Sequence, residues 1–443
     1  MEIQLSDHFT YKKLIRFTLP SIVMMLFTSI YGVVDGFFVS NLVGKEAFAS
    51  LNLIMPFLQI LGGMGAMLGI GGSALVAKTL GEGDVHRARR YFTMMIELMI
   101  VIGLLGSALG IVFIRPVSYL LGATEVLIED CVLYGRIILL FNTAMLAQYT
   151  FQSYLIVAEK PQLGLLITVL AGGANMIGDF LFMAVLPMGI AGAALATGLS
   201  QCVGGLIPAV WFLTRKNRSP LRFAKTKFEL YPMLKTCANG ASEMMTSVSG
   251  SITGMLYNWQ LMRYDPVNGV AAYGVVMYAA WMFIAIYMGF CSGSAPIMGY
   301  HFGAQNHREM RNVLKKSLSL LTLGGVILTS IAILLSRPIA SLFVGYDAEL
   351  MSITVRAFVI CALPFLFMWL NLYTSSFFTA LNNGGVSAAV SFIRSLILPT
   401  VCILVLPHFL GLDGVWFALL TSELLGTLVS VGFLVGKRKK YHY

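Results

Sequence analysis

Five acidic side chains fall inside long apolar stretches of the 443-residue chain, where an ionised group lacks water: Asp35, Glu97, Asp179, Glu243 and Glu423. A charge near the centre of a lipid bilayer costs about 2.5–3.5 kcal/mol even on a lenient insertion scale. Each of these acids therefore needs a partner, a wet cavity or a proton. Acids in such positions are candidates for a functional site.

Asp35 and Asp179 are expected to lie at the same depth. Each is 19 residues beyond a basic residue at the inner end of its helix, Arg16 and Lys160 respectively. At 1.5 Å per residue, both acids lie about 28 Å from that end. Two neighbouring carboxyl groups in a low-dielectric medium cannot easily both ionise, so such a pair takes up a proton. Alternatively, Asp35 caps a loop near the outer surface or pairs with Arg136.

Polar neighbours on the same helical faces extend this cluster. Tyr31 lies one turn before Asp35, and Asn175 lies one turn before Asp179. Further hydrogen-bonding groups come from the fourth apolar stretch, at Asn142, Gln148 and Gln152. With the amide oxygen of Asn175 added, the two carboxylates could hold Na⁺ in place of a proton.

Glu243 and Pro20 are the other two candidate site residues. Glu243 belongs to the second half of the chain, and it either touches a substrate or pairs with Lys235 or Arg394. Pro20 removes a backbone hydrogen bond below Asp35, so it either bends the first helix or gives it a fixed kink. Structural pairing or an interfacial position is expected for the remaining intramembrane charges, Glu97, Glu423, Arg356 and Arg394.

The composition is that of a polytopic membrane protein. Apolar residues make up 58% of the chain and charged residues only 11%, whereas soluble domains have about 25% charged residues. The net charge of +10 comes from Lys and Arg between the apolar stretches, so it reflects topology and not a nucleic-acid partner. No His lies deep in an apolar stretch and the six cysteines have no CxxC spacing, which argues against a metal site, a cofactor and a membrane enzyme.

Apolar stretches of spanning length predict an all-α fold of twelve transmembrane helices, because only helices or closed barrels satisfy their backbone in lipid and barrel alternation is absent. The stretches fall near residues 14–38, 51–77, 91–114, 131–157, 162–186, 190–213, 233–259, 270–299, 316–336, 351–378, 384–407 and 411–436. Most of the 30 Lys and Arg residues lie on one side of these helices. The positive-inside rule then places both termini in the cytoplasm.

The two halves of the chain repeat at an offset of 222 residues. Corresponding residues include Gly81 and Gly303, Arg89 and Arg311, and Arg115 and Arg337. Six helices per repeat is an even number, so both repeats enter the membrane from the same side and form two parallel lobes around one site, as in transporters. The expected units are a first lobe of residues 1–213, a basic cytoplasmic linker of residues 214–232 and a second lobe of residues 233–443.

The acids are not part of this duplication. Asp35 corresponds to Tyr257, and Asp179 corresponds to Val401. Ion chemistry is therefore expected in the first lobe, with Glu243 as the second lobe's own acid.

Three segments taken together resemble the multidrug and toxic compound extrusion (MATE) family, in its bacterial DinF-like and MepA-like branch. They are LPSIVMMLFTSIYGVVDGFFVSNLVG (19–44), GIGGSALVAKTLGEGDVHRARR (69–90) and GSAPIMGYHFGAQNHREMR (293–311). The resemblance implies a V-shaped pair of six-helix lobes that alternate between outward and inward openings. It also implies export of small organic cations or lipophilic drugs against an inward H⁺ or Na⁺ gradient, of which H⁺ is the first choice here.

The resemblance also assigns roles to individual residues. The branch's ion site in the first lobe matches Tyr31, Asp35, Asn175 and Asp179, and its asparagine of the fourth helix corresponds to Gln152. Bending of the first helix on protonation would fall on Pro20. The expected protein is a monomer of the bacterial inner membrane, surrounded by lipids, without a cofactor or a nucleic-acid partner.

Two other functions remain open from the sequence. A flippase for lipids or lipid-linked oligosaccharides belongs to the same superfamily, and it would need a strongly basic central cavity. Only Arg136, Arg356 and Arg394 lie within the apolar stretches to supply one. A membrane enzyme is the alternative from another class, and the missing histidine and metal constellations disfavour it.

Overall fold

The computed structural model describes residues 3–214, 219–345 and 347–443. Throughout these residues the regular secondary structure is helical, which confirms the predicted all-α fold. Residues 215–218, in the predicted linker, lie outside the described residues. We name the two groups of helices on either side of the linker the first lobe and the second lobe.

The first lobe contains helices α1 to α7 and two π-helical segments. Their bounds are α1 (Tyr11–Phe38), η1 (Val39–Val43), α2 (Lys45–Gly81), α3 (Val85–Leu120), α4 (Ile128–Leu140), α5 (Asn142–Val157), α6 (Pro161–Asp179), η2 (Phe180–Val185) and α7 (Gly189–Leu213). Small residues at helix contacts let these long helices pack closely, as is usual in membrane proteins.

The second lobe contains helices α8 to α15 and one π-helical segment. Their bounds are α8 (Leu230–Tyr264), α9 (Asn268–Gly303), α10 (His307–Val344), α11 (Ala348–Ala362), α12 (Phe365–Ala380), α13 (Gly384–Phe392), η3 (Ile393–Ile397), α14 (Leu398–Leu410) and α15 (Leu412–Tyr441). The first residues of α3 and α10, Val85 and His307, differ by the repeat offset of 222.

The transmembrane helices agree with the predicted spans. Within the described residues, nine helical spans are long and apolar enough to cross a membrane, and two bent helix pairs each form one further span. Helix α8 has 35 residues, also enough to cross, but its Ser, Thr, Asn and Glu residues lower its hydropathy. Counting α8, the structure has the twelve spans that the sequence predicts.

Two spans are broken, although the sequence predicted them as continuous helices over 131–157 and 351–378. Helices α4 and α5 meet at Phe141 with a bend of 56°, and α11 and α12 meet at residues 363–364 with a bend of 46°. Pro364 accounts for the second break, because proline cannot donate the helical hydrogen bond. Phe141 is the repeat equivalent of Leu363, but no helix-breaking residue marks it in the sequence.

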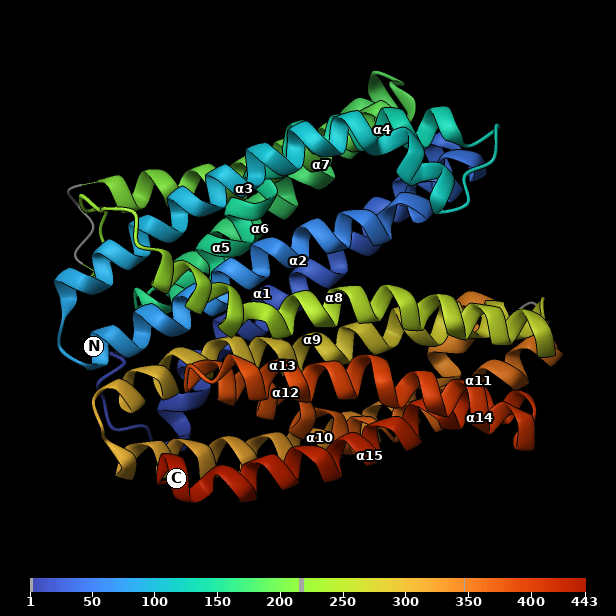
Figure 1. Cartoon of the computed structure of the whole chain (residues 1–443). Helices are drawn as coiled ribbons and strands as arrows, with labels where there is room; N and C mark the ends of the chain where they lie inside the picture. The colour runs from blue at the N-terminus through green and yellow to red at the C-terminus, as the bar shows by residue number, and fades with distance from the viewer. Residues whose placement is uncertain (1–2, 215–218, 346) are drawn as a thin grey trace.

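The two lobes lie together at the end that carries both termini and separate towards the other end (Figure 1). The surroundings of two glycines on α8 show this divergence. A β-carbon on Gly240 would lie 2.0 Å from the carbonyl oxygen of Met67 in α2, whereas one on Gly254, further along α8, would meet no atom within 4 Å. The lobes are therefore in closest contact near the termini and diverge towards the opposite end.

Repeat-related glycines make the closed contact. A β-carbon on Gly81 would lie 1.9 Å from the carbonyl oxygen of Tyr300, and one on Gly303 would lie 2.0 Å from that of Lys78. Gly81 and Gly303 correspond in the two repeats, as do Lys78 and Tyr300. The duplication thus supplies both halves of the interlobe contact, since only glycine lets the backbones approach this closely.

Replacing Gly81 with alanine is expected to force the lobes apart at this contact, because the new methyl group meets a backbone carbonyl. Overpacking of this kind typically costs about 1–3 kcal/mol. The thermal unfolding midpoint of the purified protein should therefore fall. Gly432→Ala is the matched control, since a β-carbon there meets nothing within 4 Å. Equal midpoints for the two variants would contradict the assigned contact.

The segment before each repeat crosses to the opposite lobe. Before α1, the backbone N–H of Phe9 donates to Glu309 of α10, at 2.9 Å. Before α8, the backbone N–H of Ala224 donates to the hydroxyl of Thr93 in α3, at 3.0 Å. Helices α3 and α10 correspond in the two repeats. These crossings further tie the lobes together at the end near the termini.

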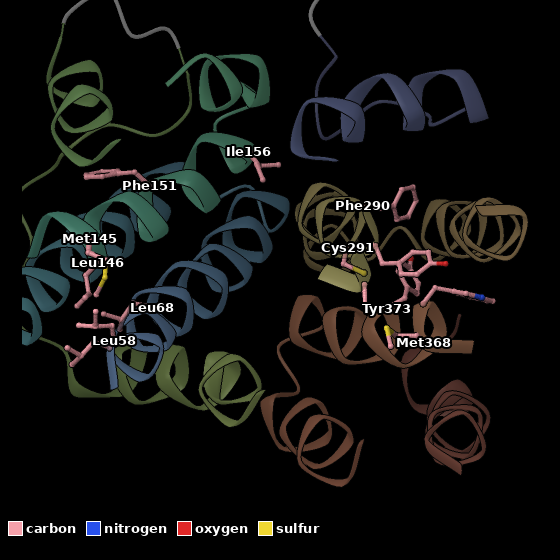
Figure 2. Close-up of a cluster of buried hydrophobic side chains, with 14 of the residues drawn as sticks. Leu58, Leu68, Met145, Leu146, Phe151, Ile156, Phe290, Cys291, Met368 and Tyr373 are labelled. Atoms are coloured by element: carbon pink, nitrogen blue, oxygen red, sulfur yellow. The ribbon is translucent and has the colours of Figure 1, made fainter. Parts of the chain in front are cut away.

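The buried apolar side chains form one cluster that extends through both lobes. Figure 2 shows buried side chains on both sides of the interlobe boundary, from α2 and α5 in the first lobe and from α9 and α12 in the second: Leu58, Leu68, Met145, Leu146, Phe151 and Ile156, and Phe290, Cys291, Met368 and Tyr373.

Candidate functional site

Asp35 and Asp179 come together between α1 and α6. Asp35 is 8% exposed and Asp179 is fully buried. The two carboxyl groups lie close enough to affect each other's ionisation, a meeting that their equal depth had made possible. Arg136, the alternative partner for Asp35, has an exposed side chain on α4, and it forms no ion pair with Asp35 among the described residues.

Both acids lie where the regular α-helix ends. Asp179 is the last residue of α6 and precedes the π-helical segment η2, and Asp35 lies one turn before η1. A π-helical turn widens the hydrogen-bonding pattern of the backbone, and such turns occur frequently at functional sites. The sequence had predicted regular helix at both places, and no residue type marks these segments.

Asn175 and Tyr31 flank the two acids as predicted. The Asn175 amide donates to the Thr197 hydroxyl of α7 at 3.4 Å, and the Tyr31 hydroxyl interacts with the Gln148 side chain and lies near Asp35. Thr197 is a site residue that the sequence reasoning missed. The only feature of the sequence that could have indicated Thr197 is that it is a polar residue within a run of small and apolar residues.

Tyr134 of α4 is a second residue that the sequence reasoning missed. Its hydroxyl interacts with Thr197, and it lies close enough to both Asp35 and Asp179 to feel their charge. Tyr134 is 1% exposed. It closes the cluster on the side of α4.

Four buried oxygens in this cluster have no hydrogen-bond partner among the described residues: Asp35 Oδ1, Asn175 Oδ1, and both carboxyl oxygens of Asp179. Buried polar atoms are nearly always satisfied, because leaving one without a partner costs about 1–3 kcal/mol. Four unpartnered acceptor atoms in one place fit either a proton or a cation with a preference for oxygen ligands. The cluster, made of Tyr31, Asp35, Asn175, Asp179 and Thr197, is referred to below as the acid cluster.

Gln152 lies apart from the acids. Its amide donates to the Thr168 hydroxyl at 3.1 Å, and Thr168 precedes Asn175 by two helical turns on α6. Gln148, one turn earlier on α5, is the glutamine that reaches the cluster through Tyr31. The extra methylene group of glutamine does not bring Gln152 to the place expected for it.

Pro20 is buried within α1, which continues as one helix from Tyr11 to Phe38. The next two residues, Ser21 and Ile22, make the backbone contact with α9, where a β-carbon on Gly289 would lie 2.4 Å from the Ile22 Cα. A bend at Pro20 would therefore act directly on the contact between the lobes.

Glu243 lies on α8, in the second lobe, and is not part of the acid cluster. Neither proposed partner reaches it: Lys235 donates to the backbone oxygen of Asn382 at 2.8 Å, and Arg394 pairs with Glu423. The side chain is near Cys291 of α9. Glu243 is thus a half-buried carboxylate without an ion pair among the residues that the structure describes.

The second lobe holds a neutralised pair instead of two acids. Arg394, within η3, donates to Glu423 through Nη2 at 2.8 Å and through Nε at 3.1 Å. Asn371 donates to the same carboxylate at 2.7 Å and accepts from the Ser430 hydroxyl at 2.8 Å. Of the two positions expected for these charges, structural pairing or the interface, Arg394 and Glu423 have the first. Arg356 likewise pairs with Asp413, at 2.5 Å.

Two repeated helical lobes, of which the first holds a buried group of acids, are typical of a membrane transporter of the two-lobed type. The family model described as MatE matches residues 20–181 and again residues 244–404. The chain therefore belongs to the MatE family, and the resemblance found in the sequence is confirmed. The two matched ranges begin at nearly equivalent positions of the repeats. Since this family consists of transporters, the chain is a transporter and not an enzyme.

Relatives and solved structures extend over nearly the whole chain. The multidrug export protein MepA of Staphylococcus aureus (strain NCTC 8325 / PS 47) is 21% identical over 95% of this chain and 92% of its own length. The protein of the same name from Staphylococcus haemolyticus (strain JCSC1435) is 22% identical over 97% of this chain and 94% of its own. The matches therefore cover nearly the full length of this chain and of both relatives.

The fold is similar to that of solved transporters. A structure described as the outward-facing conformation of a multidrug resistance MATE family transporter of the MOP superfamily has a TM-score of 0.91 and 22% identity, and covers 98% of this chain and 97% of its own. Structures of MATE in the straight and bent conformations have TM-scores of 0.91 and 0.88. These similarities confirm the predicted two-lobed fold of twelve transmembrane helices.

Proposed function

We propose that the chain is an ion-coupled multidrug efflux antiporter, which exports cationic or lipophilic compounds by alternating access. The observation that carries this proposal is the set of buried oxygens without partners on Asp35, Asn175 and Asp179. Four buried acceptor oxygens without a partner favour a cationic ligand, and a coupling ion and a cationic drug both meet that need. The name multidrug export protein of the staphylococcal relatives supports the same function.

The proposed coupling ion is H⁺ in preference to Na⁺. The carboxyl groups of Asp35 and Asp179 are close neighbours, and a single proton shared by the pair would replace their repulsion by a hydrogen bond. Na⁺ would be held by the same carboxylate and amide oxygens, with the Thr197 hydroxyl beside them. No resident cofactor is needed in either case.

In the proposed cycle, ion and drug favour opposite arrangements of the lobes. Protonation of Asp35 or Asp179 removes the negative charge that attracts a cationic drug, so ion binding and drug binding oppose each other by linkage. Bending of α1 at Pro20 would carry this change to the contact at Ile22 and Gly289. Glu243 is proposed to attract the cationic drug from the second lobe.

The proposed moving units are residues 1–213 and 233–443, with residues 214–232 as the linker. We place the protein in the bacterial inner membrane as a monomer with both termini in the cytoplasm, following the distribution of Lys and Arg. In that orientation the space between the lobes is open to the outside. This arrangement is the one from which a drug leaves and a proton enters.

A flippase for lipids or lipid-linked oligosaccharides is less well supported. Such a protein needs basic side chains around one central cavity, but the three candidates are separate. Arg136 is exposed on α4, Arg356 pairs with Asp413, and Arg394 is neutralised by Glu423. These arginines do not form one anion site.

Transport of a fluorescent organic cation by the purified protein in proteoliposomes would test the proposal. We expect counter-transport of the cation when a pH gradient is imposed, and little or none with a Na⁺ gradient alone. Transport with a Na⁺ gradient alone would mean that the coupling ion at the same residues is Na⁺ and not H⁺. An absence of transport with either gradient would contradict the proposed function.

A further inference from the structure

A cavity of about 650 Å³ lies at the tip of the second lobe, between the last part of α10 and α11. Two arginines line it together with apolar side chains: Arg337 and Arg356, with Met351, Val355, Val359 and Ile360. The tip is the end of the molecule opposite the two termini (Figure 1). Its lining combines positive charge with an apolar wall.

The two arginines lie at the same level. Arg337 precedes the end of α10 at Val344 by seven residues, and Arg356 follows the start of α11 at Ala348 by eight. At 1.5 Å per residue, both α-carbons lie about 10–12 Å from the turn that joins the helices. Val359 follows Arg356 on α11 and lies nearer to the centre of the membrane.

The duplication shows that Arg337 has lost the acid that its counterpart keeps. In the first lobe, the equivalent Arg115 pairs with Glu129 at 2.7 Å. The residue equivalent to Glu129 in the second lobe is Met351, which lines the cavity. Among the residues that the structure describes, Arg337 forms no hydrogen bond or ion pair, and it is exposed.

Arg356 also has N–H donors that its ion pair does not use. It pairs with Asp413 through one terminal nitrogen, at 2.5 Å, and its side chain is 67% exposed. A guanidinium group carries five N–H donors, so this pair leaves donors free. The cavity therefore holds two positive groups and one nearby negative group.

We propose that this cavity binds a phospholipid with an anionic headgroup. Arg337 and Arg356 would hold the phosphate, since arginine binds phosphate through paired N–H donors. One acyl chain would lie along Met351, Val355 and Val359. The ligand is a lipid and not a soluble anion, because a soluble anion would make no use of this apolar wall. With the termini in the cytoplasm, the lipid belongs to the outer leaflet. The proposal does not depend on the coupling ion or on the exported substrate.

Native mass spectrometry of the full-length protein in detergent, titrated with phosphatidylglycerol or phosphatidylcholine, tests the proposal. We expect wild-type protein to retain phosphatidylglycerol in preference to phosphatidylcholine. Arg337→Gln should weaken that binding about tenfold, the loss of roughly one charge-assisted contact. Met351→Glu should have a similar effect, because it restores the carboxylate that pairs with the equivalent arginine in the first lobe.

Arg115→Gln is the matched control, since it removes an arginine at the equivalent position that already has a partner. Its binding of phosphatidylglycerol should equal that of the wild type. An equal loss in Arg115→Gln, or none in Arg337→Gln, would overturn the site. Equal binding of phosphatidylcholine would overturn the anionic headgroup. Displacement of the lipid by millimolar inorganic phosphate would show a site for free anions and would also overturn the proposal.

Discussion

Replacing Asp35 with asparagine is expected to reduce gradient-driven export of organic cations to the background of empty liposomes. Asparagine keeps the size of the side chain but can neither carry a negative charge nor take up a proton. The acid cluster would then lose both its attraction for a cation and its response to a pH gradient. Asp179→Asn should have the same effect, because the two carboxyl groups act as a pair. The measurement is export by proteoliposomes with an imposed pH gradient.

Glu46→Gln provides the control for these variants. Glu46 is an exposed acid in the first turn of α2, outside the acid cluster, so its loss should leave export unchanged. All variants should retain the thermal unfolding midpoint of the wild type or exceed it, since removing a charge from a buried pair relieves repulsion. Unimpaired export by Asp35→Asn would show that the coupling ion binds elsewhere.

Arg394→Ala is expected to destabilise the second lobe strongly. After the substitution, the buried Glu423 carboxylate accepts a hydrogen bond only from the Asn371 amide. Breaking a buried ion pair by removing one partner typically costs about 3–5 kcal/mol. The thermal unfolding midpoint of the purified protein should fall well below that of the wild type. Export should be lost in proportion to the loss of folded protein.

The double variant Arg394→Leu with Glu423→Leu distinguishes the charge from the packing. Replacing a buried ion pair by apolar side chains is often neutral or stabilising, so this variant should recover most of the lost stability. If the double variant is as unstable as Arg394→Ala, the pair stabilises the lobe through its shape and not through its charge. Export by a stable double variant would also show that the pair has no part in coupling.

Much of the architecture could be predicted because the duplication constrains it. The offset of 222 residues predicted two lobes of six spans, and the family match to residues 20–181 and 244–404 agrees with it. The equal depth of Asp35 and Asp179 along their helices made a meeting between them possible. Helical rise is regular enough that counting residues from the inner end locates a side chain to within a turn.

The local departures from regular helix could not be predicted in the same way. Pro364 explains one broken span, but the bend at Phe141 and the π-helical segments after Asp35 and Asp179 arise from packing between helices. Such irregularities carry little sequence signal, because Ala, Gly, Phe and Leu are common in regular spans as well. The repeat relation of Phe141 to Leu363 was the one available indication.

Side-chain partners were the hardest part of the site to predict. No spacing argument had singled out Thr197 of α7 or Tyr134 of α4, and Gln152 donates to Thr168. Which face of a helix meets which neighbour depends on the close approach of small residues such as Gly198, whose β-carbon would lie 2.2 Å from the Phe141 ring. That information is in the packing and not in the period of the sequence.

Drug-induced proton release from the purified protein tests the central claim most directly. In a weakly buffered solution near neutral pH, addition of a cationic drug to the wild type should acidify the medium in proportion to the drug bound. Asp35→Asn and Asp179→Asn should release no protons under the same conditions. Drug binding by the wild type with no release of protons, and with equal affinity at acid and alkaline pH, would contradict a shared site for proton and drug at Asp35 and Asp179.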